Sequence, residues 1–171
     1  MTLRRALDAL YDAAGVLAAL LLVGTLAMVL TGIAGRLFLF HVAGTDAYAG
    51  YCMAGAGFLA LAHTLKRGEH IRVSLILEHV GIRAHRWLER WSIFAATLLA
   101  ALYAFYSVRL AYQSWQFHDI STANDATPLW IPQLAMAAGT VVLLVAFADE
   151  LALELSGKRR RARPAEALHN E

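Results

Sequence analysis

The sequence predicts an all-α integral membrane protein with four transmembrane helices, both termini in the cytoplasm, and a short amphipathic interfacial helix between helices 2 and 3. Of the 171 residues, 59% are hydrophobic and 16% are charged, whereas soluble domains carry about 25% charged residues. The charges cluster at the ends of long apolar runs. The length suits a single membrane domain, expected over residues 1–156, followed by a basic cytoplasmic tail over residues 157–171.

Four apolar runs have the length of a membrane-spanning helix, which needs about 20 residues to cross ~30 Å of hydrocarbon. They are expected at about residues 13–34, 47–65, 91–115 and 131–151. The first follows two arginines, as in a signal peptide, but it exceeds the roughly 7–15 apolar residues of such peptides, so we expect a retained span. The second has the weakest hydropathy because it is rich in glycine and alanine. Helices are expected because strands in membranes are shorter and alternate in polarity.

The basic residues are distributed unequally between the two sides of the expected bundle. Two precede the first span, six lie between the second and third spans, and five lie in the tail. The first and second spans are separated by Arg36 alone, and the third and fourth by no basic residue. Cytoplasmic segments are enriched in Lys and Arg. Both termini are therefore expected in the cytoplasm.

The segment between the second and third spans mixes apolar and charged residues. Ile71 and Leu75 are interleaved with Arg72 and Glu78, and Gly81 is expected to break the pattern. A basic amphipathic helix at the cytoplasmic interface would have this composition. The alternative is a cytoplasmic extension of the third span.

Sequence motifs of enzyme active sites are missing from the chain. It contains no GxSxG, Walker, GxGxxG or HExxH motif, which are typical of hydrolases, nucleotide-binding proteins and metalloproteases. The single cysteine, Cys52, forms no disulfide framework or zinc cluster. The seven histidines lie mostly in loops or near helix ends, which disfavours a haem site. We therefore expect no catalytic residue, no cofactor and no metal.

Arg109 is the one charge well inside a span. It precedes Trp115 by six residues, so at ~1.5 Å per residue it lies some 9 Å from the outer end. We expect it to extend toward the interface or to form a structural ion pair; a functional pairing with an acid or a lipid phosphate is the alternative. All four tryptophans lie beside span ends, which is typical of an aromatic belt. The candidate lipid or partner contacts are Arg109, Trp87, Trp91 and Trp115.

Small residues recur at helical spacing in the first two spans. They include Ala47, Gly50, Ala54 and Gly57 in the second, and Gly24, Gly32 and Gly35 in the first. Small faces let membrane helices approach closely. Two interpretations stay open, namely packing within this bundle and contact with a partner.

Three motifs resemble those of the small membrane subunit, the DctQ-type small permease, of tripartite ATP-independent periplasmic (TRAP) transporters. They are GRLF at 35–38, LALAHTLKRGEHIRVSLILEHV after the middle of the second span, and TPLWIP at 127–132. The motif positions are Gly35, Arg36, Phe38, Asp46, Gly68, His70, Ile71, Arg72, Val73, Trp130 and Pro132. Relatives often carry a tryptophan and paired acids where this chain keeps Asp46 alone, and a proline where it has Ala138.

The resemblance implies a noncatalytic scaffold subunit of a secondary, sodium-gradient-driven importer of organic acids such as C4-dicarboxylates, in the bacterial cell inner membrane. It implies two protein partners: a large elevator-type membrane subunit, and a periplasmic substrate-binding protein that docks on the outer face. Membrane lipids are expected contacts, and nucleic acid is not. Two alternatives stay open. One is a small self-contained homo-oligomeric transporter, which the missing midplane carboxylate disfavours; the other is the membrane anchor of a redox enzyme.

Overall fold

The computed structural model describes residues 2–40, 42–67 and 81–156. These ranges contain four helices, α1 (Thr2–Leu37), α2 (Thr45–Arg67), α4 (Ile82–Gln116) and α5 (Trp130–Leu155), and no β-strand. A helix satisfies its own backbone hydrogen bonds, which makes it the stable form of a long apolar run in lipid. The all-α prediction is confirmed for these ranges. The expected interfacial helix falls largely on residues 68–80, outside the described residues.

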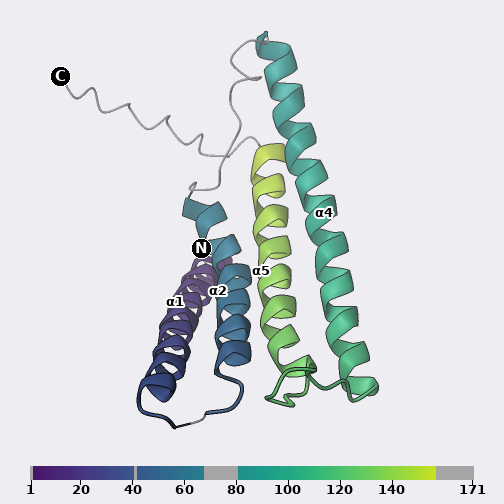
Figure 1. The fold of residues 1–171 in the computed structure, drawn as a ribbon. Coiled ribbons are helices and arrows are strands. Elements are labelled where there is room, and N and C mark those ends of the chain that lie inside the picture. Colours follow the sequence, from purple (N-terminus) through teal and green to yellow (C-terminus); the bar gives the residue numbers. More distant parts are fainter. Residues whose placement is uncertain (1, 41, 68–80, 157–171) are drawn as a thin grey trace, which may run out of the picture.

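The four helices stand side by side in the order α1, α2, α5, α4 (Figure 1). Helix α2 packs between α1 and α5, and α5 packs between α2 and α4. We call the end with the α1–α2 and α4–α5 connections the loop end, and the opposite end, where Lys66 and Arg90 lie, the basic end. In this row α1 and α4 are the outermost helices. Each therefore leaves most of its surface unpacked.

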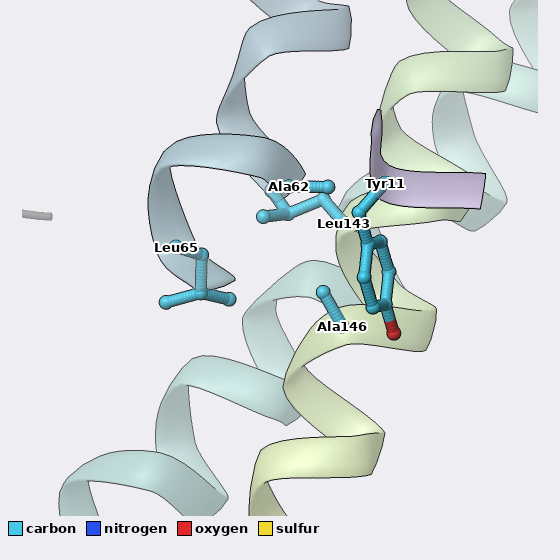
Figure 2. Packing of buried hydrophobic residues seen from close by; sticks show 5 residues of the cluster. All are labelled: Tyr11, Ala62, Leu65, Leu143 and Ala146. Carbon is cyan, nitrogen blue, oxygen red and sulfur yellow. The ribbon is translucent and has the colours of Figure 1, made fainter. Parts of the chain in front are cut away.

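Small side chains form much of the contact between α1, α2 and α5. One buried cluster combines Tyr11, Ala62, Leu65, Leu143 and Ala146 (Figure 2). A second cluster contains two alanines of α1 with a leucine of α2. Because alanine has only a methyl group, such faces bring helix backbones close together, as is typical of membrane bundles.

Three of the described helices are long and apolar enough to cross a membrane, over Arg4–Leu37, Trp87–Gln116 and Trp130–Leu155. Helix α2 is not among them, although it has 23 residues. Its glycines, alanines and polar residues lower its hydropathy, which the sequence already ranks lowest of the four runs. The finding supports a multi-pass membrane protein. A membrane span formed by α2 stays a proposal.

Two helices extend beyond the predicted spans at the basic end. Helix α1 begins at Thr2 rather than near residue 13, because Leu7 and Tyr11 continue its packed face into the charged region. Helix α4 begins at Ile82 instead of residue 91, and Gly81 is its N-cap in an extended conformation. A helix thus begins directly after the expected break at Gly81, whereas the segment before it lies outside the described residues. Residues 82–90 are therefore a continuous extension of the third apolar run.

The α4–α5 connection is a folded turn. The amide of Ser121 donates to the Thr127 carbonyl (2.8 Å) and that of Leu129 to the Asp119 carbonyl (2.9 Å). Helix α5 then begins at Trp130. Pro132 lies in its first turn, where the missing N–H costs no helical hydrogen bond. The predicted helix start is confirmed.

Candidate functional site

Polar contacts between helices gather at the two ends of the row. Ion pairs among the described residues lie near the basic end or at the loop end. The same residues contain no cluster of three or more His, Cys, Asp or Glu able to hold a metal ion. Between the ends, the helix contacts are made mainly by alanine, glycine and leucine. The candidate site is therefore this pair of polar clusters and the apolar faces between them.

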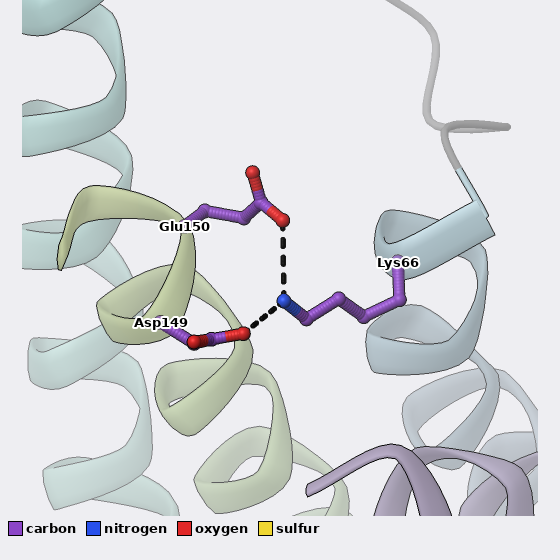
Figure 3. A network of polar contacts seen from close by, with 3 residues as sticks. All are labelled: Lys66, Asp149 and Glu150. Carbon is purple, nitrogen blue, oxygen red and sulfur yellow. Dashed lines mark hydrogen bonds and ion pairs between the residues drawn. The ribbon is translucent and has the colours of Figure 1, made fainter. Parts of the chain in front are cut away.

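The Lys66 cluster joins three helices at the basic end. The Lys66 ammonium of α2 lies between the carboxylates of Asp149 and Glu150 on α5, with the Glu150 oxygen at 3.2 Å (Figure 3). The same ammonium lies 5.3 Å from the centre of the Tyr11 ring of α1. The three charged side chains are 14–18% exposed. Because two carboxylates face one ammonium, removal of Lys66 leaves two poorly solvated charges.

A second ion pair attaches α4 to the basic end. The Arg90 guanidinium of α4 lies 3.7 Å from the Glu154 carboxylate of α5. Arg90 is 62% exposed whereas Glu154 is 16% exposed. Because the Arg90 side chain is exposed, water screens its attraction to Glu154, and this contact contributes only modestly to stability. It nevertheless holds the first turns of α4 against the last turns of α5.

The Tyr51 cluster joins α2 to the α4–α5 connection at the loop end. The Tyr51 hydroxyl lies 2.9 Å from Ser121 Oγ and 3.2 Å from Asp125 Oδ2. One turn earlier in α2, Tyr48 accepts a hydrogen bond from the Thr127 hydroxyl at 3.1 Å. Two tyrosines of α2 thus form hydrogen bonds with both halves of the α4–α5 connection.

Asp125 also requires a glycine in the α1–α2 connection. Gly44 has a φ of +78°, which L side chains rarely adopt. A Cβ atom on Gly44 would also lie 2.6 Å from Asp125 Cβ. The two connections at the loop end are therefore in direct contact. At position 44 this contact leaves no space for a side chain larger than the hydrogen of glycine.

The hydrogen bonds around Asp125 make the Tyr51 cluster sensitive to acid. Hydrogen bonding from Thr127, and to a lesser degree from Ser121 and Tyr51, holds the pKa of Asp125 below its ordinary value of 3.8. A lowered pKa stabilises the fold above that ordinary value, and the gain is lost as the pH falls through the folded-state pKa. We expect the difference in Tm between the wild type and Asp125→Asn to be largest near neutral pH and to shrink as the pH falls below 3.8 and through the lower folded-state pKa. Thermal unfolding of both proteins followed by circular dichroism across this range measures it, and a constant difference would contradict the prediction.

Several predicted motif residues lie together beside the α1–α2 connection. Arg36 pairs with Asp46 at 3.8 Å, with the side chains 78% and 89% exposed. Gly35 is buried, and a Cβ atom added there would lie 2.7 Å from the Phe40 carbonyl oxygen. An open pocket of about 520 Å³ lies at this place, lined by both connections. Phe38 points away from the core and is 76% exposed.

The other predicted site residues are spread over the molecule. Trp87 and Trp91 are exposed near the basic end of α4, and Trp115 is exposed near its loop end. Trp130 and Pro132 are half-buried in the first turn of α5. Five motif residues lie outside the described residues: Gly68, His70, Ile71, Arg72 and Val73.

The small residues of the first two spans divide between the two interpretations. Gly24 and Gly32 face Cys52 and Thr45 of α2, so they pack within the bundle. Around Gly50 and Gly57, in contrast, no other atom lies within 4 Å of the Cβ position. The face of α2 that packs inside is the one with Gly55, Ala56 and Ala62. The stripe with Gly50 and Gly57 is open.

Sequence reasoning did not identify the pairing partners in either polar cluster. In the sequence, Asp149 and Glu150 lie near the end of the apolar run expected over residues 131–151. A signal for their contact with Lys66 does exist, because opposite charges at equal depth in two spans are expected to pair. The Tyr51 contact with Asp125 has no comparable signal. The two residues are 74 positions apart in the chain, and whether they meet in space depends on the path of the loops.

A comparison with protein families identifies the chain. The family described as "Tripartite ATP-independent periplasmic transporters, DctQ component" matches residues 25–157, which is more than three quarters of the chain. The chain belongs to the DctQ family. Searches of curated proteins and of solved structures returned no significant match. The resemblance noted in the sequence motifs is confirmed.

Family membership gives the polar clusters a setting. DctQ proteins are components of a tripartite transporter, so this DctQ-family chain is a membrane component of a transport system. The match covers α2, α4 and α5 entirely and about the last third of α1. Both clusters are included, apart from Tyr11. They connect neighbouring helices of the DctQ fold at its two ends.

Proposed function

We propose that this chain is the noncatalytic scaffold subunit of a secondary, sodium-gradient-driven TRAP importer of organic acids. It supports a large elevator-type membrane subunit, which receives the substrate from a periplasmic binding protein. The observation that carries the proposal is the distribution of polar contacts, which lie at the two ends of the row of helices. An ion or substrate pathway requires polar groups near the membrane centre. A supporting element requires connections that keep its helices in place.

The shape of the row also supports a mechanical role. The order α1, α2, α5, α4 places the helices in a broad layer with extensive apolar faces. A subunit that moves through the bilayer needs a neighbour that does not tilt with it. A broad layer with tryptophans near both ends resists tilting. The Lys66 and Tyr51 clusters restrain sliding of the helices past one another.

We propose that the protein lies in the bacterial inner membrane with its basic end in the cytoplasm. All four helices cross the membrane, residues 1–156 form one domain, and residues 157–171 form a cytoplasmic tail. The distribution of Lys and Arg supports this orientation. Two observations support a membrane span formed by α2. The helix has 23 residues, or ~34 Å at 1.5 Å per residue, and it packs between α1 and α5.

Cysteine labelling tests the orientation. In a Cys52→Ser background, Asn124→Cys places a thiol at the loop end and Ser156→Cys places one at the basic end, both at exposed positions. A membrane-impermeant maleimide added to spheroplasts is expected to label the thiol at position 124 and not the one at position 156. Both thiols are expected to react after detergent lysis. The opposite pattern in intact spheroplasts would invert the topology.

Reconstitution tests the transport role. We expect sodium-dependent uptake of an organic acid into proteoliposomes only when this chain, its large membrane subunit and the binding protein are all present. Omission of this chain is expected to abolish uptake. Uptake by this chain alone would favour a self-contained homo-oligomeric transporter. A redox cofactor in the purified protein would favour an anchor for a redox enzyme, and either result would contradict the proposal.

A further inference from the structure

The surface between α4 and α5 carries a long apolar groove. The packed face of α4 consists largely of small residues, among them Ala104, Ser107 and Ala111, so its backbone lies close to α5. Large side chains on both sides then form the walls. Two hollows of about 540 and 590 Å³ follow each other along this groove and share three lining residues, Val108, Tyr112 and Val141. They are parts of one groove.

The groove lies where a lipid chain would lie and is long enough to cover one leaflet. It begins at Trp115 and Trp130 near the loop end and reaches Ala101 and Leu144. From residue 115 to residue 101 the helix rises ~21 Å, whereas one leaflet provides ~15 Å of hydrocarbon. Tryptophan is enriched at the level of lipid headgroups. The groove therefore begins at headgroup depth and reaches at least the middle of the bilayer.

Arg109 places a positive charge on the edge of this groove. It lines the second hollow and is exposed. No acidic side chain within residues 2–40, 42–67 and 81–156 forms an ion pair with it. A cation within a membrane span is stabilised by an anion or by contact with the headgroup region. An anion at the headgroup level satisfies both requirements through the long arginine stem.

We propose that the α4–α5 groove binds one anionic phospholipid. Its phosphate pairs with Arg109, and one acyl chain lies along Val108, Val141 and Leu144. A lipid with a net negative charge neutralises the guanidinium, whereas a zwitterionic headgroup brings its own cation. A carboxylate from another protein would complement Arg109 but would leave the apolar length of the groove without an occupant. The proposal requires only that α4 and α5 span the bilayer, so it stands apart from the transport role.

Quenching of tryptophan fluorescence tests this site in the full-length chain. Trp87, Trp91 and Trp115 are replaced with phenylalanine, which leaves Trp130 in the groove wall as the sole fluorophore. The protein is reconstituted in phosphatidylcholine vesicles with small fractions of dibrominated phosphatidylglycerol or dibrominated phosphatidylcholine. We expect half-maximal quenching at a several-fold lower fraction of the anionic lipid.

Four substitutions in this background separate the parts of the proposal. Arg109→Gln is expected to remove the preference for the anionic lipid, and Arg109→Lys to retain it. Arg36→Gln, which removes an exposed arginine at the same end of the protein, is expected to leave the preference unchanged. Val141→Phe fills the part shared by both hollows and is expected to weaken quenching by both lipids. Unchanged helical circular dichroism shows that each variant is folded.

Three results would overturn the proposal. The first is equal quenching by the two lipids in the protein whose sole tryptophan is Trp130 and which carries no further substitution. The second is quenching that Val141→Phe leaves unchanged, which would place the lipid outside the groove. The third is an Arg109→Gln protein that keeps its lipid preference. If that variant also failed to co-purify with the large membrane subunit, Arg109 would instead be assigned to a contact between proteins.

Discussion

Replacement of Lys66 by methionine is expected to lower the free energy of unfolding by roughly 3 kcal/mol, the cost typical of breaking a buried ion pair. Methionine keeps most of the apolar stem but removes the ammonium between Asp149 and Glu150. These carboxylates are only 17% and 18% exposed, so water compensates little of the lost interaction. The expected result is a less stable contact between α2 and α5. Reversible unfolding in mixed micelles, followed by circular dichroism, measures the change.

A rescue experiment separates this charge effect from a loss of packing. The triple substitution Lys66→Met, Asp149→Asn and Glu150→Gln removes the charge of all three side chains, so it is expected to recover a large part of the stability that Lys66→Met loses. Arg36→Met is the matched control, because its pair with Asp46 is highly exposed and is expected to contribute less than about 1 kcal/mol. Equal losses for Lys66→Met and Arg36→Met would contradict a special role for the Lys66 cluster.

Gly139→Leu is expected to separate α2 from α5 and to destabilise the protein by roughly 3 kcal/mol, at the upper end of the usual cost of overpacking. A Cβ at position 139 would lie 2.6 Å from the carbonyl carbon and 2.7 Å from the carbonyl oxygen of Phe58. Because these are backbone atoms of α2, no side-chain rotation can relieve the overlap. The whole helix must move, and contacts of the neighbouring Thr140 are expected to be lost with it.

Gly57 provides the matched control for this substitution. It lies in the same pair of helices as the Gly139 contact, but no atom is found within 4 Å of its Cβ position. Gly57→Ala is therefore expected to be neutral or to stabilise α2 by up to about 1 kcal/mol through helix propensity. The same unfolding assay compares the two variants. If Gly57→Ala alone were strongly destabilising, the open face of α2 would have to be a packed surface.

Most helices could be predicted from the sequence because each apolar run has the length of a bilayer crossing. The ends were harder to predict. The uncharged run of the first span starts at Ala13, yet α1 starts at Thr2 because Tyr11 packs against α2 and α5. A hydropathy profile does not predict this extension of α1, because Tyr11 is a single packed residue among charged neighbours. Gly81 directly before α4 and Pro132 in the first turn of α5 act locally on the backbone, so the starts of these helices depend less on tertiary packing.

The candidate site was only partly predictable for the same reason. Asp46 and Arg36 belong to recognisable motifs, and their pairing bridges a short connection. Tyr51 meets Asp125 across 74 residues, so the contact depends on how α5 places its preceding loop. Gly50 and Gly139 look alike in the sequence. Their surroundings differ completely, because one faces open space and the other the backbone of Phe58.

An α-helical membrane chain with motifs of the DctQ family could be predicted from residue order alone. Those properties follow from run length, hydropathy and local residue patterns. All three depend on residues that are close together in the sequence. Three features required the folded chain: the order of the helices, the pairing of Lys66 with Asp149 and Glu150, and the groove beside Arg109. These depend on which faces meet, and small apolar residues on several faces make many packings of similar energy available. A few contacts distant in the chain select one of them.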